Sequence, residues 1–292
     1  MTSGYLQPDA TMGGGKSQYY KKIVNRLLVP YFATCVVYLL YDIAFTYYKG
    51  MFDPLRVVRS IGAMIIGVQS FDGGCGCVSM WFVYALFIIK LIDAFIPNRF
   101  KPVFAILCIA CAIPLSKYEI TWAVTDIFLA YPLYVIGQFI SKRGESVIEW
   151  LRNTNIWFKL LVMVLLLAST YIVSTFNGFV KMYMGGYGNN LFLFFIGAFT
   201  GTLAIVILSF LLENVRWKHL LTISTGTIII LEFQTYFLFV IRHILVVLLK
   251  LDSCLDMISM ISSAFIMLSF IPIIKFLNKY LPVFSGKSFI LK

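Results

Sequence analysis

Long apolar runs separated by short polar stretches dominate the hydrophobic pattern of this chain. A helix that crosses the hydrocarbon core of a bilayer needs roughly 20 consecutive, mainly apolar residues. The pattern therefore predicts an all-α, polytopic membrane helix bundle with about eight transmembrane helices. The expected spans are Leu27–Tyr48, Val78–Ile96, Pro102–Ser116, Ile120–Ile140, Ile156–Phe176, Leu191–Leu212, Ile223–Leu249 and Met257–Phe276.

Two further segments have a different pattern. Val57–Phe71 is apolar but is interrupted by Arg59, Gly62 and Gly67, which favours a half-inserted or surface helix over a span. The segment 141–155, SKRGESVIEWLRNTN, is typical of a short amphipathic helix lying on the inner leaflet.

The basic residues between the apolar runs predict the orientation of the chain. Cytoplasmic loops of membrane proteins carry an excess of lysine and arginine. Eight alternating spans with a cytoplasmic N-terminus place most of the 24 lysines and arginines in the cytoplasm. We expect a single membrane domain with a cytoplasmic segment 1–26, a transmembrane bundle 27–276 and a cytoplasmic tail 277–292.

The composition supports this interpretation and excludes an ordinary soluble domain. The chain is 60% hydrophobic and only 13% charged, whereas a soluble domain is about 25% charged. The net charge of +11 lies between apolar spans, where it sets topology and attracts anionic lipid. We therefore expect a membrane-lipid partner and no nucleic-acid partner.

The six cysteines do not indicate a metal centre. Four of them lie in or beside apolar spans and are interpreted as small hydrophobic residues: Cys35, Cys108, Cys111 and Cys254. Cys75 and Cys77 form a lone C-x-C in a glycine-rich loop, which is a weak metal signal. We predict no metal site.

Five stretches along nearly the whole chain carry short motifs in a consistent order. They are KKIVNRLLVPYF (21–32, a basic pair before R-L-L-x-P-Y), WFVYALFIIKLI (81–92), NGFVKMYMGGYGNNLFLFFIGAFTGTLAIVILS (177–209), STGTIIILEFQTYF (224–237) and YLPVFSGK (280–287, with x-x-P-x-x-x-G-K). In this order they resemble acyltransferase family 3, the polytopic membrane acyltransferases, and in particular the fucose 4-O-acetylase-like branch.

The resemblance implies an O-acyltransferase of a bacterial inner membrane. Such a protein transfers an acyl group, usually acetyl from acetyl-CoA on the cytoplasmic side, to a hydroxyl of a cell-envelope or surface-polysaccharide sugar. Acyl-CoA is then a donor substrate, and no bound cofactor is expected. A histidine would act as acid and base, while arginines hold negative charge on the donor.

The chain departs from the family pattern at the residues that carry the chemistry. Family members begin with two more helices, the first of which holds the catalytic histidine, so that histidine is expected upstream of Met1. The segment Thr2–Leu6 resembles the end of the second of these helices. Ile23 replaces the first arginine of an R-x-x-R motif, and Gln234 replaces a late histidine.

The candidate catalytic residues lie in the seventh expected span. An ionisable side chain within a membrane is costly and usually functional, which selects Glu232 and His243. They are eleven residues apart and share one helix face, while Gln234 lies on another. Arg26 and Lys22 are the candidate donor-binding residues, although both also suit the role of topology anchors.

The candidate acceptor-binding residues lie on the outer side of the predicted topology. Trp81 follows a glycine-rich loop, and the loop 177–190 contributes Asn177, Tyr187 and Asn189. Membrane-interface placement explains Trp81 equally well, and an ordinary turn explains the glycines of the loop. Two acids within other expected spans, Asp42 and Asp126, are predicted to make structural pairs.

Two other functions compete with acyl transfer. One is a transporter of lipid-linked sugar or polysaccharide, which would contain broken helices in symmetric halves. The other is an inactive, truncated remnant of the family, which the absent catalytic helix favours.

Overall fold

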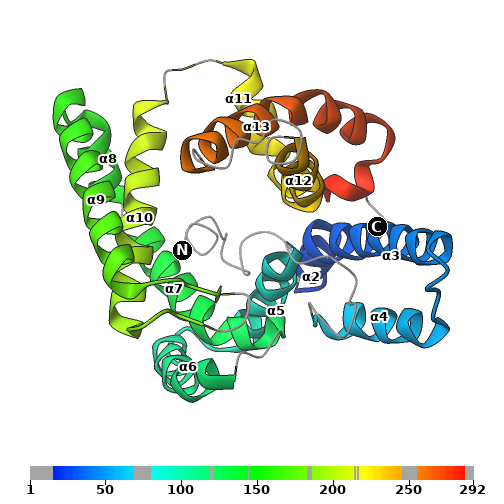
Figure 1. Cartoon of the computed structure of the whole chain (residues 1–292). Helices are drawn as coiled ribbons and strands as arrows, with labels where there is room; N and C mark the ends of the chain where they lie inside the picture. Colours follow the sequence, from blue (N-terminus) through cyan, green and yellow to red (C-terminus); the bar gives the residue numbers. More distant parts are fainter. Residues whose placement is uncertain are drawn as a thin grey trace. The chain divides into compact units, whose positions relative to one another are not determined.

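The computed structural model describes residues 16–68, 80–118, 122–143, 145–182, 186–213, 215, 217–244 and 255–286. The elements within these residues are helices, as the hydrophobic pattern predicts (Figure 1). The chain divides into two compact units, and each is described by itself. Unit 1 contains Met1–Lys16 and Ile88–Arg216, and unit 2 combines Ser17–Phe87 with Trp217–Lys292.

Six helical segments in the described part of the chain are long and apolar enough to cross a membrane. They are Gln18–Tyr48, Lys101–Tyr118, Ala123–Ser141, Ile156–Asn177, Leu191–Leu211 and Ser263–Tyr280. These segments correspond to six of the predicted spans, so the prediction of a helical membrane protein is confirmed. The other two, Val78–Ile96 and Ile223–Leu249, coincide with shorter described helices. A total of eight spans stays a prediction.

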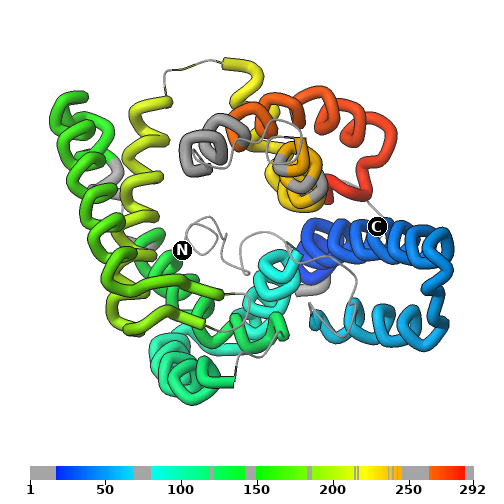
Figure 2. Tube along the Cα trace, viewed as in Figure 1, coloured from blue at the N-terminus to red at the C-terminus, as the bar shows by residue number. Residues whose placement is uncertain are grey.

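Unit 1 contains a long antiparallel helix pair. Helices α9 (Ile156–Asn177) and α10 (Leu191–Leu211) form this pair and lie side by side in Figure 2. Glycine on α10 permits their close approach, since a Cβ on Gly197 would lie 3.3 Å from Val173 Cγ1 of α9. The hydroxyls of Thr170 and Thr200 join the two helices at 2.9 Å. The elements of unit 1 are the end of α5 (Trp81–Phe95), α6 (Lys101–Leu115), η3 (Ser116–Tyr118), α7 (Ala123–Arg143), α8 (Glu145–Asn153), α9 (Ile156–Asn177) and α10 (Leu191–Leu211).

The segment predicted to be a short amphipathic helix is α8, so its helical state is confirmed. An exposed ion pair between Arg152 and Glu213, 3.0 Å apart, joins the end of α8 to the chain just beyond α10. The position of α8 on the inner leaflet stays a prediction.

The first described helix runs without interruption from Lys16 to Tyr48, and from Ser17 on it belongs to unit 2. It therefore starts well before Leu27, where the first span was predicted. The elements of unit 2 are α2 (Lys16–Ile23), the π-helical turn η1 (Val24–Leu28), α3 (Val29–Tyr48), α4 (Pro54–Ile66), the start of α5, α11 (Lys218–Thr225), α12 (Thr227–Arg242), α13 (Leu255–Tyr280) and η7 (Pro282–Ser285).

Helix α4 covers most of the segment that was predicted not to span. Its 13 residues extend about 20 Å, which is too short for a hydrocarbon core of about 30 Å. The Asp53 side chain caps its first turn by accepting a hydrogen bond from Leu55 N. Arg56 pairs with Asp42 of α3 at 2.8 Å, which confirms the structural pairing predicted for Asp42.

The seventh predicted span, Ile223–Leu249, is not one continuous helix. The helix breaks at Gly226, where α11 ends and α12 begins. A Cβ on Gly226 would lie 2.5 Å from Ile274 Cδ1 of α13. A side chain at this position would therefore prevent the close packing of the helix junction on α13. Ile229 and Ile230 of α12 continue the same contact and form a buried core with Phe270 and Ile274.

Candidate functional site

The turn at the start of α3 has an unusual geometry that the local sequence explains. Residues 24–28 form a π-helical turn, in which Val29 N donates to the carbonyl oxygen of Val24, five residues earlier. Pro30 follows directly, and a proline ring clashes with the carbonyl four residues before it, here that of Arg26. The wider turn relieves this clash, and such π-bulges are frequent at functional sites. Arg26 lies on this turn with its side chain exposed.

The turn that follows α13 in unit 2, η7 with Gly286, packs on the backbone of Arg26. After η7, Gly286 adopts φ +64°, and a Cβ there would lie 2.7 Å from the Arg26 carbonyl oxygen and 3.0 Å from its Cα. Only glycine fits this contact without a shift of one backbone against the other. The contact brings together the motif stretches 21–32 and 280–287, which lie near opposite ends of the sequence.

We expect Gly286→Ala to destabilise unit 2 by on the order of 2 kcal/mol. A left-handed conformation costs a residue with a Cβ roughly 1–2 kcal/mol, and the contact with Arg26 adds to this. Gly50→Ala is the matched control, because Gly50 has φ +68° but nothing within 4 Å of its Cβ position. Unfolding in detergent should show a larger loss for Gly286→Ala; equal losses would contradict a tight contact at Arg26.

Glu232 is the buried acid of unit 2. It lies on α12 with no exposed surface, and neither oxygen of its carboxyl group has a hydrogen-bond partner among the described residues. Thr34 of α3 lies beside it, but the Thr34 hydroxyl donates to the Pro30 carbonyl oxygen at 2.9 Å. The Tyr38 hydroxyl donates at 2.7 Å to the backbone oxygen of Glu232. The Tyr38 hydrogen bond therefore holds the backbone of Glu232 against α3, while the two carboxyl oxygens lie buried near Thr34 without a hydrogen bond of their own among the described residues.

The other two catalytic candidates lie in different surroundings from Glu232. Gln234 is half-buried and His243 is exposed, just beyond the end of α12. The helix face predicted to hold both Glu232 and His243 is therefore buried at Glu232, and the chain is exposed at His243. Of the three candidates, Glu232 alone is buried.

The two donor-binding candidates lie one helical turn apart on α2 and η1. Lys22 and Arg26 have the i, i+4 spacing that places side chains on one face, and both are exposed. Two exposed cations on one face can hold a phosphate group by charge-assisted hydrogen bonds.

The acceptor candidates are divided between the units. Trp81 is half-buried at the start of α5 in unit 2, whereas the other three lie in unit 1. Asn177 is buried and closes its loop: its side-chain nitrogen donates to the Tyr187 carbonyl oxygen at 2.7 Å, and its side-chain oxygen accepts from Asn190 N at 2.8 Å. Asn189 remains exposed. Neither unit brings all four together.

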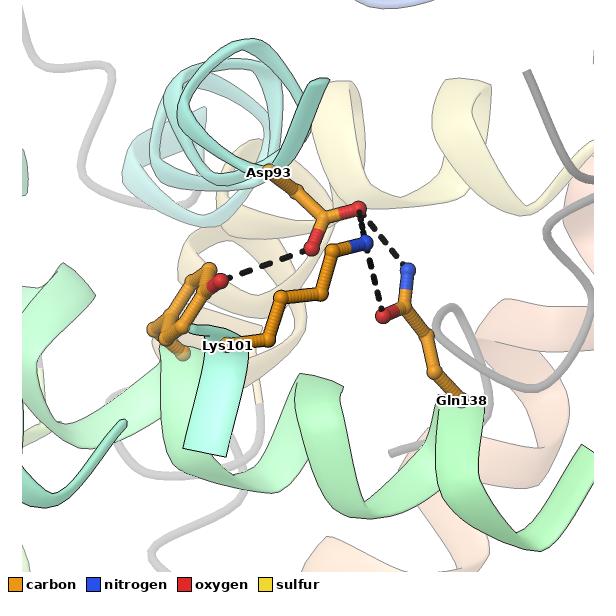
Figure 3. A network of polar contacts seen from close by, with 4 residues as sticks. Asp93, Lys101 and Gln138 are labelled. Carbon is orange, nitrogen blue, oxygen red and sulfur yellow. Dashed lines mark hydrogen bonds and ion pairs between the residues drawn. The ribbon is translucent and has the colours of Figure 1, made fainter. Parts of the chain in front are cut away.

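A polar network in unit 1 was missed by the sequence interpretation (Figure 3). Asp93 of α5 is 3% exposed and accepts hydrogen bonds from Lys101 at 2.9 Å and from Gln138 at 2.8 Å. The Tyr131 hydroxyl donates to its other oxygen at 3.4 Å, and Lys101 also donates to Gln138 at 3.2 Å. The sequence signal that could have revealed this network is Asp93 itself, an acid inside the apolar run 78–96.

The remaining sequence predictions concern cysteines, metal sites and Asp126. Cys35 and Cys108 are buried, as expected of small hydrophobic residues, whereas Cys111 is exposed. Asp126 is also buried. Cys75, Cys77 and Cys254 lie outside the described residues. Within the described ranges, no group of three or more His, Cys, Asp or Glu side chains has an arrangement that could hold a metal ion.

No protein-family model matches this chain, and neither a curated protein nor a solved structure matches it.

Proposed function

We propose that this protein is a membrane O-acyltransferase whose reaction centre lies in unit 2. The observation that carries the proposal is the contact of Gly286 with the backbone of Arg26, because it joins two motif stretches that are distant in sequence. A third stretch, 224–237, contacts the stretch 280–287, because the rings of Phe233 and Phe284 lie 5.8 Å apart, and the backbone oxygen of Glu232 accepts a hydrogen bond from Tyr38 of α3.

The exposed cations and the buried acid have complementary roles in this proposal. Lys22 and Arg26 hold the phosphates of acyl-CoA, and Glu232 lies deeper in the membrane domain. Thr34, beside Glu232, follows Arg26 by eight residues, a rise of about 12 Å along a helix. A separation of this kind suits a donor whose thioester is joined to its phosphates by a long pantetheine arm.

Glu232 accepts the proton in the proposed reaction. The acceptor hydroxyl oxygen attacks the thioester carbonyl carbon while the Glu232 carboxylate takes the hydroxyl proton. The C–S bond then breaks, and the thiolate of CoA leaves and takes up the proton that Glu232 accepted, which restores the Glu232 carboxylate. The products are the O-acyl ester and free CoA. The acceptor is a sugar hydroxyl of the cell envelope or of a surface polysaccharide.

The same contact supports the predicted topology. The backbones of Arg26 and Gly286 lie against each other, which favours an even number of crossings between them. Unit 2 is also built from both ends of the sequence, whereas a transporter repeat is a continuous half of the chain. These features favour acyl transfer over transport.

Gene deletion and complementation test the proposal. Deletion should remove O-acetyl signals from the envelope glycan, and the wild-type gene should restore them. Arg26→Gln should lower transfer from acetyl-CoA by about 10- to 100-fold, since a hydrogen bond to a charged group contributes ~1.5–3 kcal/mol. Lys49→Gln, at the other end of α3, is the matched control and should restore wild-type transfer.

Two results would overturn the proposal. One is an unchanged O-acetyl content after deletion, together with no consumption of acetyl-CoA by the purified full chain. The other is wild-type transfer by Arg26→Gln, which would remove Arg26 from donor binding.

A further inference from the structure

Side chains of α12 and α13, two helices of unit 2 that pack on each other, line an apolar groove of about 480 Å³. Its lining is made entirely of hydrophobic side chains: Phe233, Phe237, Pro272, Ile273, Phe276 and Leu277. Because the part of α13 that lines it is long and apolar enough to cross a membrane, the groove suits an occupant made of hydrocarbon.

Positive charge lies at one end of the groove. Pro272, Phe276 and Lys279 have the i, i+4, i+7 spacing of a single helix face, and Lys279 is exposed. The Lys279 ammonium lies 5.0 Å from the centre of the Tyr280 ring. Lys275, also exposed, lies in the turn between Pro272 and Lys279. The rise from Pro272 to Lys279 is about 10 Å.

Negative charge is scarce on these two helices. Among the described side chains of α12 and α13 the one acid is Glu232, which is fully buried. An apolar groove with Lys279 at its end and Lys275 exposed beside it on the same helix is therefore complementary to a molecule that carries a hydrocarbon chain and an anionic head.

We propose that the groove binds one acyl chain of an anionic phospholipid, with the lipid phosphate at Lys275 and Lys279. The chain replaces disordered bilayer hydrocarbon in the groove, and the lysines select the head group. Each lysine near a membrane surface contributes ~1 kcal/mol of attraction for anionic lipid. This lipid-binding site is independent of the proposed acyl transfer, because neither Lys275 nor Lys279 has a role in that reaction.

Photo-crosslinking of the full chain in lipid nanodiscs tests this site. The discs contain phosphatidylcholine with a small fraction of probe lipid that carries a diazirine at the end of one acyl chain. The probe is either phosphatidylglycerol or phosphatidylcholine, and labelled peptides are mapped by mass spectrometry. We expect the anionic probe to label peptides containing 233–237 and 272–277 several-fold more than the zwitterionic probe.

Charge variants then identify the head-group site. Lys279→Gln should reduce labelling by the anionic probe about fivefold, the factor that corresponds to ~1 kcal/mol, and the double variant with Lys275→Gln should label equally with both probes. Lys49→Gln is the matched control, since the Lys49 ammonium also lies over a ring, that of Phe45, at 4.4 Å. Labelling by this variant should equal that of the wild type.

Three outcomes would overturn the lipid site. Equal labelling of the wild type by both probes would show unselective contact with bulk lipid. An unchanged preference in the double variant would remove the lysines from head-group binding. Loss of labelling on addition of long-chain acyl-CoA, with no loss on addition of CoA alone, would assign the groove to a soluble acyl donor instead.

Discussion

Replacing Lys101 with methionine will lower the free energy of unfolding by about 3–5 kcal/mol, because it leaves the carboxylate of Asp93 buried without its cation. The side chains of Asp93 and Lys101 are 2% and 12% exposed, so water cannot take the place of the ammonium. Gln138 and Tyr131 would continue to donate to Asp93, but neither carries a charge. Titration of the purified protein with denaturing detergent, followed by circular dichroism, measures the loss.

Two controls separate the charge from the packing in this network. Adding Asp93→Asn to Lys101→Met removes both charges and should recover most of the lost stability, since removing a whole buried ion pair is often neutral. Arg152→Met breaks the exposed pair with Glu213 and should cost less than ~1 kcal/mol. A Lys101→Met protein as stable as the wild type would show that Asp93 does not depend on the ion pair.

The spans of unit 1 were predicted closely because one physical demand sets their limits. A bilayer requires about 20 apolar residues per crossing, and the predicted span Ile156–Phe176 is α9 to within one residue. Asn155 and Asn190 reinforce the helix starts, because each caps its helix by accepting a hydrogen bond from a backbone nitrogen two residues later. Hydropathy and capping are both local properties that can be read from neighbouring residues.

The interior contacts were not predictable in the same way. The three partners of Asp93 are 8, 38 and 45 residues away in sequence, and no local pattern marks that association. The π-helical turn at Arg26 likewise follows from Pro30 only once a helix is known to continue through it. The break at Gly226 reflects packing on Ile274, which hydropathy does not record.

Glu232 is the proposed proton acceptor, and its burial is the structural feature that sets it apart from the other candidates. An acid in an apolar run was visible in the sequence, and the structure buries its carboxyl group with both oxygens unpartnered among the described residues. A buried polar group without partners costs free energy, so its retention points to a function. Glu232→Gln, which keeps the shape but accepts no proton, should reduce acyl transfer by about 10²–10⁴-fold. Gln234→Ala, a change at a half-buried neighbour, is the control and should alter transfer by less than about tenfold.

Stability measurements distinguish a functional Glu232 from a structural one. Glu232→Met replaces an unpartnered carboxyl group with an apolar side chain of similar length, so the free energy of unfolding should stay constant or rise by about 1–2 kcal/mol. The same variant should have no acyl transfer. A residue that contributed to folding through its carboxyl group would give the opposite pair of results, with lost stability and transfer reduced only in proportion to the folded fraction. Detergent unfolding and acetyl-CoA consumption, measured on one preparation, therefore decide between the two roles.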